Sequence, residues 1–286
     1  MSFGFLSRRP LLATGAFFLI VALAVGPRAP LEAQGLGGLQ NADGPLTIDA
    51  DEGIEWQRDR QVYIARGNAV ATRGNITVAA DELVAHYRED TAGETDIYQI
   101  DAIGSVVITS PTERITGDKG VYYADRGMMR MTGESLRYET AEDVVTARDS
   151  LEYWEDFDGG PIAVARGDAV AERKTKEERI AAEVLTASLA PDADGKLAVV
   201  RLDGEGDVEV STPIDYARGN EGVYYVKEER AELNGDVKIT RGENQLNGER
   251  AEVNMKTGVS RLLPGEGGRV RGLIIPQKSA AEPNSQ

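Results

Sequence analysis

The segment Ala65-Arg-Gly-Asn-Ala-Val-Ala-Thr-Arg73 returns one hundred positions later as Ala165-Arg-Gly-Asp-Ala-Val-Ala-Glu-Arg173. Similarity at a fixed spacing is the sequence sign of a repeated structural unit. Small and apolar residues dominate both copies, and a glycine sits at the same place in each. The stretch therefore predicts that the chain is built by repeating one unit.

Three later segments repeat in the same order, and the offset drifts only from 100 to 102. They pair Ile100–Pro111 with Leu202–Pro213, Gly117–Tyr123 with Gly219–Tyr225, and Met131–Glu134 with Leu233–Asp236. We therefore predict a first unit over residues 46–145 and a second over 146–276 that includes a terminal strand.

Within each unit, glycines punctuate short apolar or alternating runs, which predicts short strands and turns. These glycines are Gly67, Gly104, Gly133, Gly167, Gly206 and Gly235. The dipeptides Asp43-Gly44, Asp158-Gly159 and Asp194-Gly195 are of the kind most favoured in tight turns. The pattern predicts strand–turn–strand units.

One segment has the composition of a helix. Residues 177–190 are rich in Glu, Ala and Leu, which have high helix propensity. Its counterpart in the first unit, Ile76–Tyr87, reads as a strand, and duplicated units share a fold. We let the repeat override the propensity and predict a strand here.

Composition excludes several classes of protein. The net charge is −16, and no local Lys/Arg cluster offsets it, which argues against nucleic-acid binding. The chain has no cysteine, which excludes disulfides, thiolate metal sites and a Cys nucleophile. Nothing in the sequence requires a cofactor or a metal, and we predict a protein that is not an enzyme.

The N-terminus reads as an export signal. Arg8 and Arg9 precede the uncharged apolar run Leu11–Val25, and residues 1–33 match a secretory signal peptide. Leu31 is a poor residue at its place before the cut after Ala33, so an uncleaved membrane anchor stays an alternative. The small polar tail, residues 277–286, is expected to be disordered.

Together these features predict an all-β, antiparallel architecture. A closed barrel, a solenoid and a folded-over sheet all fit repeated strands. Aromatic residues make up only 6% of the chain, too few for the girdles of a membrane barrel. We favour an open, twisted β-roll with an aliphatic inner face.

At this point a family resemblance emerges. The string Ile64–Leu83, with Ile100–Ile108 and Gly117–Tyr123, resembles the core of the OstA-like family, which includes the lipopolysaccharide transport protein LptA. Arg269–Pro276 resembles the family's final strand. The likeness covers about Leu46 to Pro276.

The resemblance implies a β-jelly roll whose groove holds the acyl chains of lipopolysaccharide in the periplasm. It also implies head-to-tail association with itself and docking onto LptC-like and LptD-like components. The chain is longer than the family's basic roll, which leaves open an LptC-like anchored role. A structural envelope scaffold that binds only proteins is a further alternative.

Alternation selects residues for the groove, because side chains two apart on a strand share a face. The predicted lining is Ile76, Val78, Leu83, Val106, Ile108, Val121, Tyr123, Val208, Val210, Val223, Tyr225, Val237, Ile239, Val253 and Met255. In the two tyrosine pairs we place the second ring inward, with Val121 or Val223. Whether Ala69, Ala71, Ala169 and Ala171 point inward stays open.

The two end strands are predicted to be competent for strand addition, since neither contains a proline. They are Leu46–Ala50 and Val270–Ile275, and the predicted joint residues are Leu46, Ile48, Val270, Leu273 and Ile275.

The remaining polar and aromatic features read as structural. His86, the single histidine, is expected at the surface or rim. The acidic group Asp49, Asp51, Glu52 and Glu55 lacks the spacing of a calcium loop and is expected to be solvated. Trp56 and Trp154 are expected to pack at the ends of the roll.

Overall fold

The computed structural model describes residues 46–89, 95–193, 195, 197–254, 256–257 and 259–275. The strands are β1 (Thr47–Asp49), β2 (Gly53–Gln57), β3 (Val62–Arg73), β4 (Ile76–Glu89), β5 (Thr95–Thr109), β6 (Glu113–Tyr123), β7 (Met128–Thr132), β8 (Leu136–Thr140), β9 (Asp143–Ala147), β10 (Ser150–Trp154), β11 (Ile162–Arg173), β12 (Glu178–Pro191), β13 (Leu197–Ser211), β14 (Asp215–Tyr225), β15 (Arg230–Arg241), β16 (Asn244–Asn254), β17 (Val259–Leu263) and β18 (Arg271–Leu273). Two 3-10 turns, η1 (Arg58–Arg60) and η2 (Ala124–Arg126), complete the elements.

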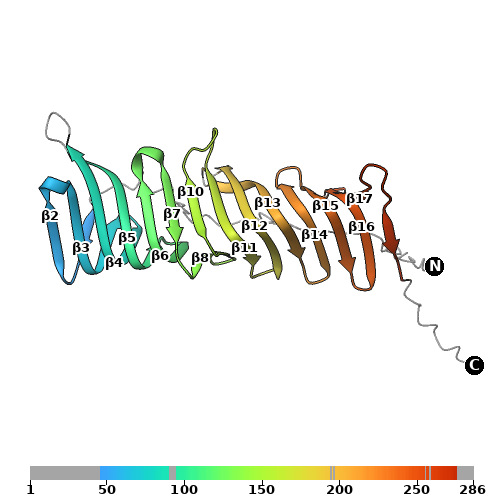
Figure 1. Cartoon of the computed structure of the whole chain (residues 1–286), viewed down its shortest axis with the longest axis horizontal. Helices are drawn as coiled ribbons and strands as arrows, with labels where there is room; N and C mark the ends of the chain where they lie inside the picture. Colours follow the sequence, from blue (N-terminus) through green and yellow to red (C-terminus); the bar gives the residue numbers. More distant parts are fainter. Residues whose placement is uncertain are drawn as a thin grey trace, which may run out of the picture.

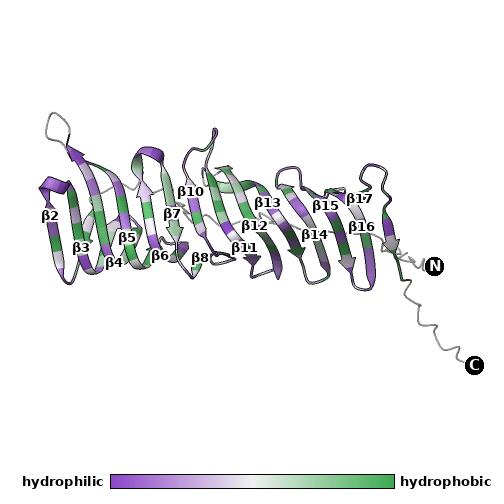
Figure 2. Ribbon diagram, viewed as in Figure 1, coloured by the Kyte–Doolittle hydropathy of each residue, from purple (hydrophilic) through white to green (hydrophobic). Residues whose placement is uncertain are grey.

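The strands form one antiparallel sheet that runs the length of the molecule (Figure 1). From β3 to β6 and from β11 to β16, each strand pairs with the next one along the chain. Apolar and polar residues alternate along the strands, as Figure 2 shows. The all-β fold class predicted from the sequence is therefore confirmed. In the part of the chain that the structure describes, no helix is long and apolar enough to cross a membrane.

The strand predicted over residues 177–190 is present as β12, which pairs on both sides with β11 and β13. Its counterpart β4 occupies the same place in the first unit, between β3 and β5. β12 makes backbone hydrogen bonds to a neighbouring strand on each edge. The stabilisation from this pairing outweighs the segment's intrinsic preference for a helix.

Five of the six punctuating glycines lie inside long strands and bend them, while Gly133 falls between β7 and β8, so the prediction that the glycines separate short strands is wrong for most of them. The main strands are 11 to 15 residues long, and most contain a register shift. In β3 the shift lies between Arg66 and Ala69, where Gly67 and Asn68 both have positive φ. A bulge of this kind bends the strand and increases its twist. The bend therefore divides each long strand into two halves. We call the two facing surfaces that these halves form the walls of the roll.

Gly167 tests how much these bends contribute to stability. Its φ is +81°, and an added Cβ would lie 3.0 Å from the backbone nitrogen of Asp149. Gly242 has φ +54° with nothing within 4 Å, so it isolates the backbone term. We expect Gly242→Ala to lower the free energy of unfolding by about 1 kcal/mol and Gly167→Ala by about 3 kcal/mol.

Urea unfolding of the two variants measures this difference. Equal losses would mean that the bend at Gly167 needs only the positive φ and not the close approach of the neighbouring chain.

Candidate functional site

Three rows of inward side chains run across the sheet and form the candidate site; together they take in every strand of the roll. The first row lies on one wall. Reading partner to partner across the sheet, the first ladder is Ile48, Ala71, Val78, Ile108, Ile115, Tyr138, Val145, Ala171, Ile180, Val210, Ala217, Ile239, Leu246 and Gly272. Apart from the glycine, every member belongs to the apolar core or packs against it.

The other wall carries two such rows. The second ladder is Ile54, Ala65, Leu83, Ala102, Gly120, Met131, Leu151, Ala165, Leu185, Gly204, Gly222, Leu233, Ala251 and Leu262. The third is Trp56, Tyr63, Ala85, Ile100, Tyr122, Met129, Tyr153, Ala163, Ala187, Leu202, Tyr224, Ala231, Val253 and Ser260. Small and large residues mix in both rows, which lets facing side chains interdigitate.

The ladders run across the strands and therefore along the long axis of the roll. Neighbouring strands lie roughly 4.8 Å apart, so each ladder extends about 60 Å. Between the walls, the bends form a floor of small and β-branched residues, including Ala69, Val106, Ala169, Val208 and Val237, all nearly inaccessible to solvent. The result is an apolar lining that continues from one end of the chain to the other.

The two walls face each other inside the second unit. A cavity of about 30 Å³ is lined by Ile180 and Val210 of the first ladder and by Leu185, Leu202 and Leu233 of the other wall. This is roughly the volume that one water molecule takes up in the liquid. Side chains of both walls therefore fill most of the inner space at this place, and an acyl chain there needs the walls to separate.

Nothing in the sheet hydrogen bonding prevents that separation. Among the described residues, every strand pairing joins neighbours within the sheet, and none joins one wall to the other. The walls are therefore held together by side-chain packing, and the bends at the floor are the natural hinges.

The rim of the first wall is polar. Arg173 donates to Asp143 over 3.0 Å, and Arg241 makes two 2.6 Å bonds to Asp215, which is 5% exposed. Burial raises the pKa of Glu113, while the hydrogen bond from the Tyr138 hydroxyl, 2.9 Å long, opposes that rise. These paired charges make the rim of the first wall polar, and they lie outside the ladders, which carry no charged residue.

Most residues predicted for the groove do point inward. Ile76, Leu83, Val106, Ile108, Val208, Val210, Val237, Ile239 and Val253 are in the apolar core, and Val78 packs against it. Met255 lies outside the described residues. The four alanines whose direction the sequence left open also point inward, with Ala69 and Ala169 fully buried.

The inward placement of Tyr123 and Tyr225 is wrong, Val121 is half-buried outside the core, and Val223 is half-buried and lines the cavity of the second unit. Tyr224 belongs to the core and Tyr122 packs against it, whereas Tyr225 lies outside, with the Arg230 guanidinium 4.3 Å from its ring centre. The cause is the register shift between Arg218 and Glu221, which reverses the alternation halfway along β14. Strict alternation from Ala217 therefore selects the wrong tyrosine.

Several ladder residues were not predicted. Met131, Leu151, Leu185 and Leu233 are all 8% exposed or less. Alternation could have found them, since Met131 follows Met129 across Arg130 and Leu151 precedes Tyr153 across Glu152. The repeat is a second signal, because Met131 and Leu233 occupy matching positions in the two units.

The predicted end strands are present but shorter than expected. β1 pairs with β3, and β18 pairs with β16. Leu46, Val270, Leu273 and Ile275 are exposed, and Ile48 is half-buried as the first member of its ladder. In the part of the chain that the structure describes, the outer edges of β1, β2, β17 and β18 pair with no other strand.

The remaining predicted features are found as follows. His86 is half-buried, with Nε2 2.7 Å from Asp101. The Trp56 ring stacks on Tyr63 at the end of the roll, and its Nε1 donates to the Tyr87 hydroxyl. Trp154 meets Phe157 edge-on. Asp49, Asp51, Glu52 and Glu55 are exposed along β1, β2 and the corner between them.

Comparison with known proteins adds the family. The family model described as "LptA/(LptD N-terminal domain) LPS transport protein" matches residues 47–153 and 164–259. A similar solved structure is LptH from Pseudomonas aeruginosa, described as the LptA homologous periplasmic component of the conserved lipopolysaccharide transport device. It is 14% identical, with 81% of this chain and 96% of that chain covered and a TM-score of 0.20. Among curated proteins no match is found.

The two matched segments cover both repeats and contain most members of all three ladders. They make up well over half of the sequence. The chain therefore belongs to the LptA/(LptD N-terminal domain) family of lipopolysaccharide transport proteins.

Proposed function

We propose that this protein carries lipopolysaccharide across the periplasm, with the lipid's acyl chains lying along the three ladders. The observation that supports this most is the unbroken apolar lining, which no strand interrupts with a charge. Each methylene group moved from water into such a lining gains about 0.8 kcal/mol. A chain of methylenes can then advance along the roll without meeting a polar barrier.

Entry of lipid requires the walls to separate along the side where they share no backbone hydrogen bonds. The work of opening is the loss of side-chain contact between walls, and incoming acyl chains restore that contact. A dry lining with alternating small and large residues suits flexible chains, because a chain can adapt to gaps that a rigid ligand cannot fill.

The free edges at the two ends support association with other rolls. Unpaired N–H and C=O groups at a sheet edge add further strands readily. We propose head-to-tail association of copies and docking onto LptC-like and LptD-like components through these edges. The predicted signal peptide, residues 1–33, lies outside the described residues and would direct export to the periplasm.

A second candidate is a structural scaffold whose roll is filled by its own side chains and which binds only proteins. The size of the cavity, about 30 Å³, favours this reading. The two candidates differ in whether lipid ever touches an inward side chain.

Adjacent tyrosines provide a matched test of lipid contact. Tyr224 points inward and Tyr225 outward on the same strand. We expect a photo-reactive benzoylphenylalanine at Tyr224 to crosslink lipopolysaccharide in growing cells, and the same residue at Tyr225 to give little product. Both substitutions keep one aromatic ring and add a benzoyl group, so circular dichroism of each variant serves as the check that the fold is kept.

The pair Tyr122 and Tyr123 repeats the test in the first unit. Strong labelling at both inward positions supports a lining shared by the two units. Absence of lipid product at both, with the proteins folded and exported, would favour the scaffold.

A further inference from the structure

The chain contains a joint between its own two units, formed as two rolls meeting edge to edge. At the end of the first unit, β7 pairs with β10 and β8 pairs with β9. Each of the three ladders passes through this joint. It does so at Met131 opposite Leu151, Met129 opposite Tyr153, and Tyr138 opposite Val145.

The N-terminal edge has the same construction as one side of this joint. β1 and β2 lie on β3 as β9 and β10 lie on β11: Ile54 faces Ala65 as Leu151 faces Ala165. The corner between the short strands is also shared. The Asp51 N–H donates to the Gly67 carbonyl over 2.8 Å, and the Arg148 N–H donates to the Gly167 carbonyl over 2.7 Å.

The C-terminal edge has the construction of the other side. β17 and β18 pair with β16 in the same way as β7 and β8 pair with β6. Leu262 faces Ala251 as Met131 faces Gly120, and Gly272 faces Leu246 as Tyr138 faces Ile115. The two ends of the chain are therefore the two halves of the internal joint, each without its counterpart.

Burial of equivalent side chains shows what each end lacks. Leu151 and Tyr153 are each 8% exposed inside the joint, while their counterparts Ile54 and Trp56 are 54% and 47% exposed at the free edge. At the other end, Val270 is 40% exposed, whereas its counterpart Leu136 is 2% exposed. Exposed apolar residues gathered at one place mark an interaction surface.

The charged residues at the two ends also correspond to those of the internal joint. In the internal joint Glu152 lies between Arg166, at 3.4 Å, and Arg130, at 3.6 Å, and its side chain is 8% exposed. At the free edge Glu55 pairs with Arg66 at 3.0 Å, and its side chain is 53% exposed. The residue that corresponds to Arg130 stands at the opposite end of the molecule: it is Arg261 of β17.

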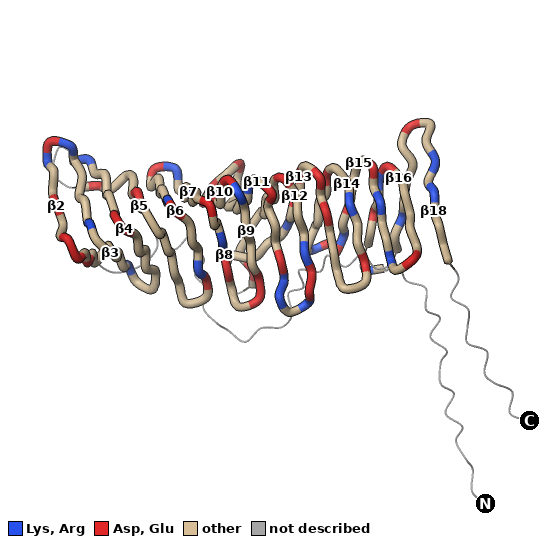
Figure 3. Tube along the Cα trace, turned by 60° about the horizontal axis from the view of Figure 1, so that its bottom comes forward, with Lys and Arg blue, Asp and Glu red and all other residues tan. Residues whose placement is uncertain are grey.

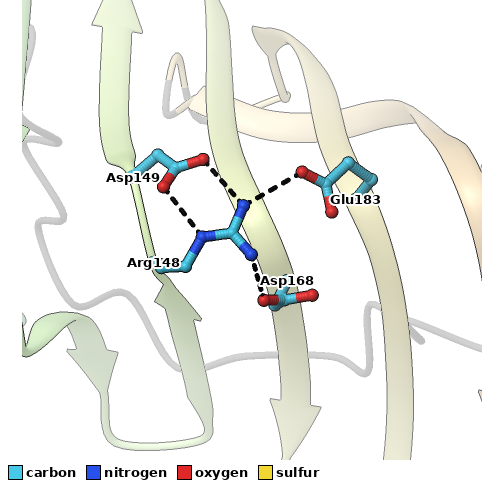
Figure 4. A network of polar contacts seen from close by, with 4 residues as sticks. All are labelled: Arg148, Asp149, Asp168 and Glu183. Atoms are coloured by element: carbon cyan, nitrogen blue, oxygen red, sulfur yellow. Dashed lines mark hydrogen bonds and ion pairs between the residues drawn. The ribbon is translucent and has the colours of Figure 1, made fainter.

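The corner between the short strands differs in charge between the internal joint and the N-terminal edge. Arg148 in the internal corner contacts Asp149, Asp168 and Glu183 (Figure 4), and its hydrogen bonds lower the pKa of Asp149. At the N-terminal corner Asp51 takes the place of this arginine. That corner is therefore acidic, while Arg269 and Arg271 lie at the far end; Figure 3 shows red at the foot of β2 and blue along β18.

We infer that β17 and β18 of one copy pair with β2 and β1 of the next in the register of the internal joint. Leu262 then lies opposite Ile54, Gly272 opposite Ile48, and Arg261 opposite Glu55. This inference rests on the proposed head-to-tail association and adds its register and its recognition pair. In this register all three ladders continue from copy to copy, because a slip of one residue would turn them to the outer face.

Cysteine pairs test the register, and the natural chain has no cysteine to interfere. The register places Val259 opposite Gln57, at the 4.5–5.5 Å Cα spacing typical of facing residues, which a disulfide can bridge. Mixed chains carrying Val259→Cys and Gln57→Cys should form about tenfold more oxidised dimer than Leu263→Cys with Gln57→Cys. Met128→Cys with Trp154→Cys is the matched control within one chain, since these residues face each other at the internal joint.

Sedimentation of the reduced, unsubstituted mature chain tests head-to-tail association separately from its register. Association with dimer formed at Leu263 and not at Val259 overturns the register and leaves head-to-tail joining intact. A chain that stays monomeric at every concentration overturns both.

Charge reversal tests the recognition pair. Arg261→Glu should weaken self-association about tenfold, and adding Glu55→Lys in the same chain should recover most of the loss. Failure of the double variant to recover, with both proteins folded, would remove Arg261 and Glu55 from recognition.

Discussion

A mature chain ending at Arg269 is expected to remain folded and to associate with itself at least about a hundredfold more weakly than the full-length protein. The truncation removes β18 and with it the last member of the first ladder. Leu273 and Ile274 are 57% and 71% exposed, so the fold loses little apolar burial with them. The joint, in contrast, loses one of its two edge strands and the backbone hydrogen bonds that strand would supply.

Sedimentation over a range of concentrations, with circular dichroism as the check on β content, measures this effect. Ile214→Ser is a suitable control, because Ile214 is 63% exposed but lies in the turn between β13 and β14, away from both ends. A truncated chain that sediments like the intact one would place the joint elsewhere. Weaker association in the control as well would indicate nonspecific apolar contact.

The repeat was the strongest predictor of the fold. It assigned a strand to residues 177–190 against their helix propensity, and β12 occupies that place. Its power comes from tertiary structure: two copies of a unit must bury the same face against the same neighbours, so evidence from the clearer copy applies to the other. Propensity is a property of the segment alone and carries no such information.

Alternation predicted inward faces only as far as the nearest bend. Val208 and Val210 are both inward, as their spacing indicates. Tyr225 is outward because an irregular step in β14 changes the phase between Ala217 and the tyrosines. The sequence shows the glycine at such a register shift. It does not show how many residues of each strand are left unpaired there, and that number decides which face the following side chains occupy.

Individual ladder residues such as Val78 and Val210 could be predicted from sequence, but the order in which they line up across the strands could not, because it depends on register. Ile115 and Tyr138 belong to one row only because β6 and β8 pair with Glu113 opposite Thr140. A shift of a single residue would have placed Arg137 in the lining. Lipid contact is a further step, since a lining for acyl chains and an ordinary core have the same residue types.

Plugging the roll at one point should therefore separate transport from mere folding. Gly204 and Gly222 are adjacent in the second ladder and line the cavity. A Cβ at Gly222 would lie 3.1 Å from Leu233 and 3.2 Å from Val208, and neither glycine has a positive φ that would forbid a side chain. We expect Gly222→Leu to cost about 1–3 kcal/mol of stability through overpacking and to block the movement of acyl chains past this point.

The expected pattern has three parts. Lipid crosslinking from the benzoylphenylalanine at Tyr224, beside the plug, should fall to background. Crosslinking from Tyr122, in the first unit, should persist, because lipid can still enter there. Delivery of lipopolysaccharide to the cell surface should stop, although the protein is exported and folded.

Gly160→Leu makes the same chemical change in the loop before β11, where nothing lies within 4 Å of the new Cβ, and it should leave all three readouts unchanged. Normal delivery by Gly222→Leu, with Tyr224 still labelled, would contradict transport along the ladders. Lipid would then travel along another surface of the protein, and the ladders would be a core. Loss of labelling at Tyr122 and Tyr224 together would also contradict such transport, because a local obstruction cannot remove lipid from the other unit when lipid enters along the whole length of the lining.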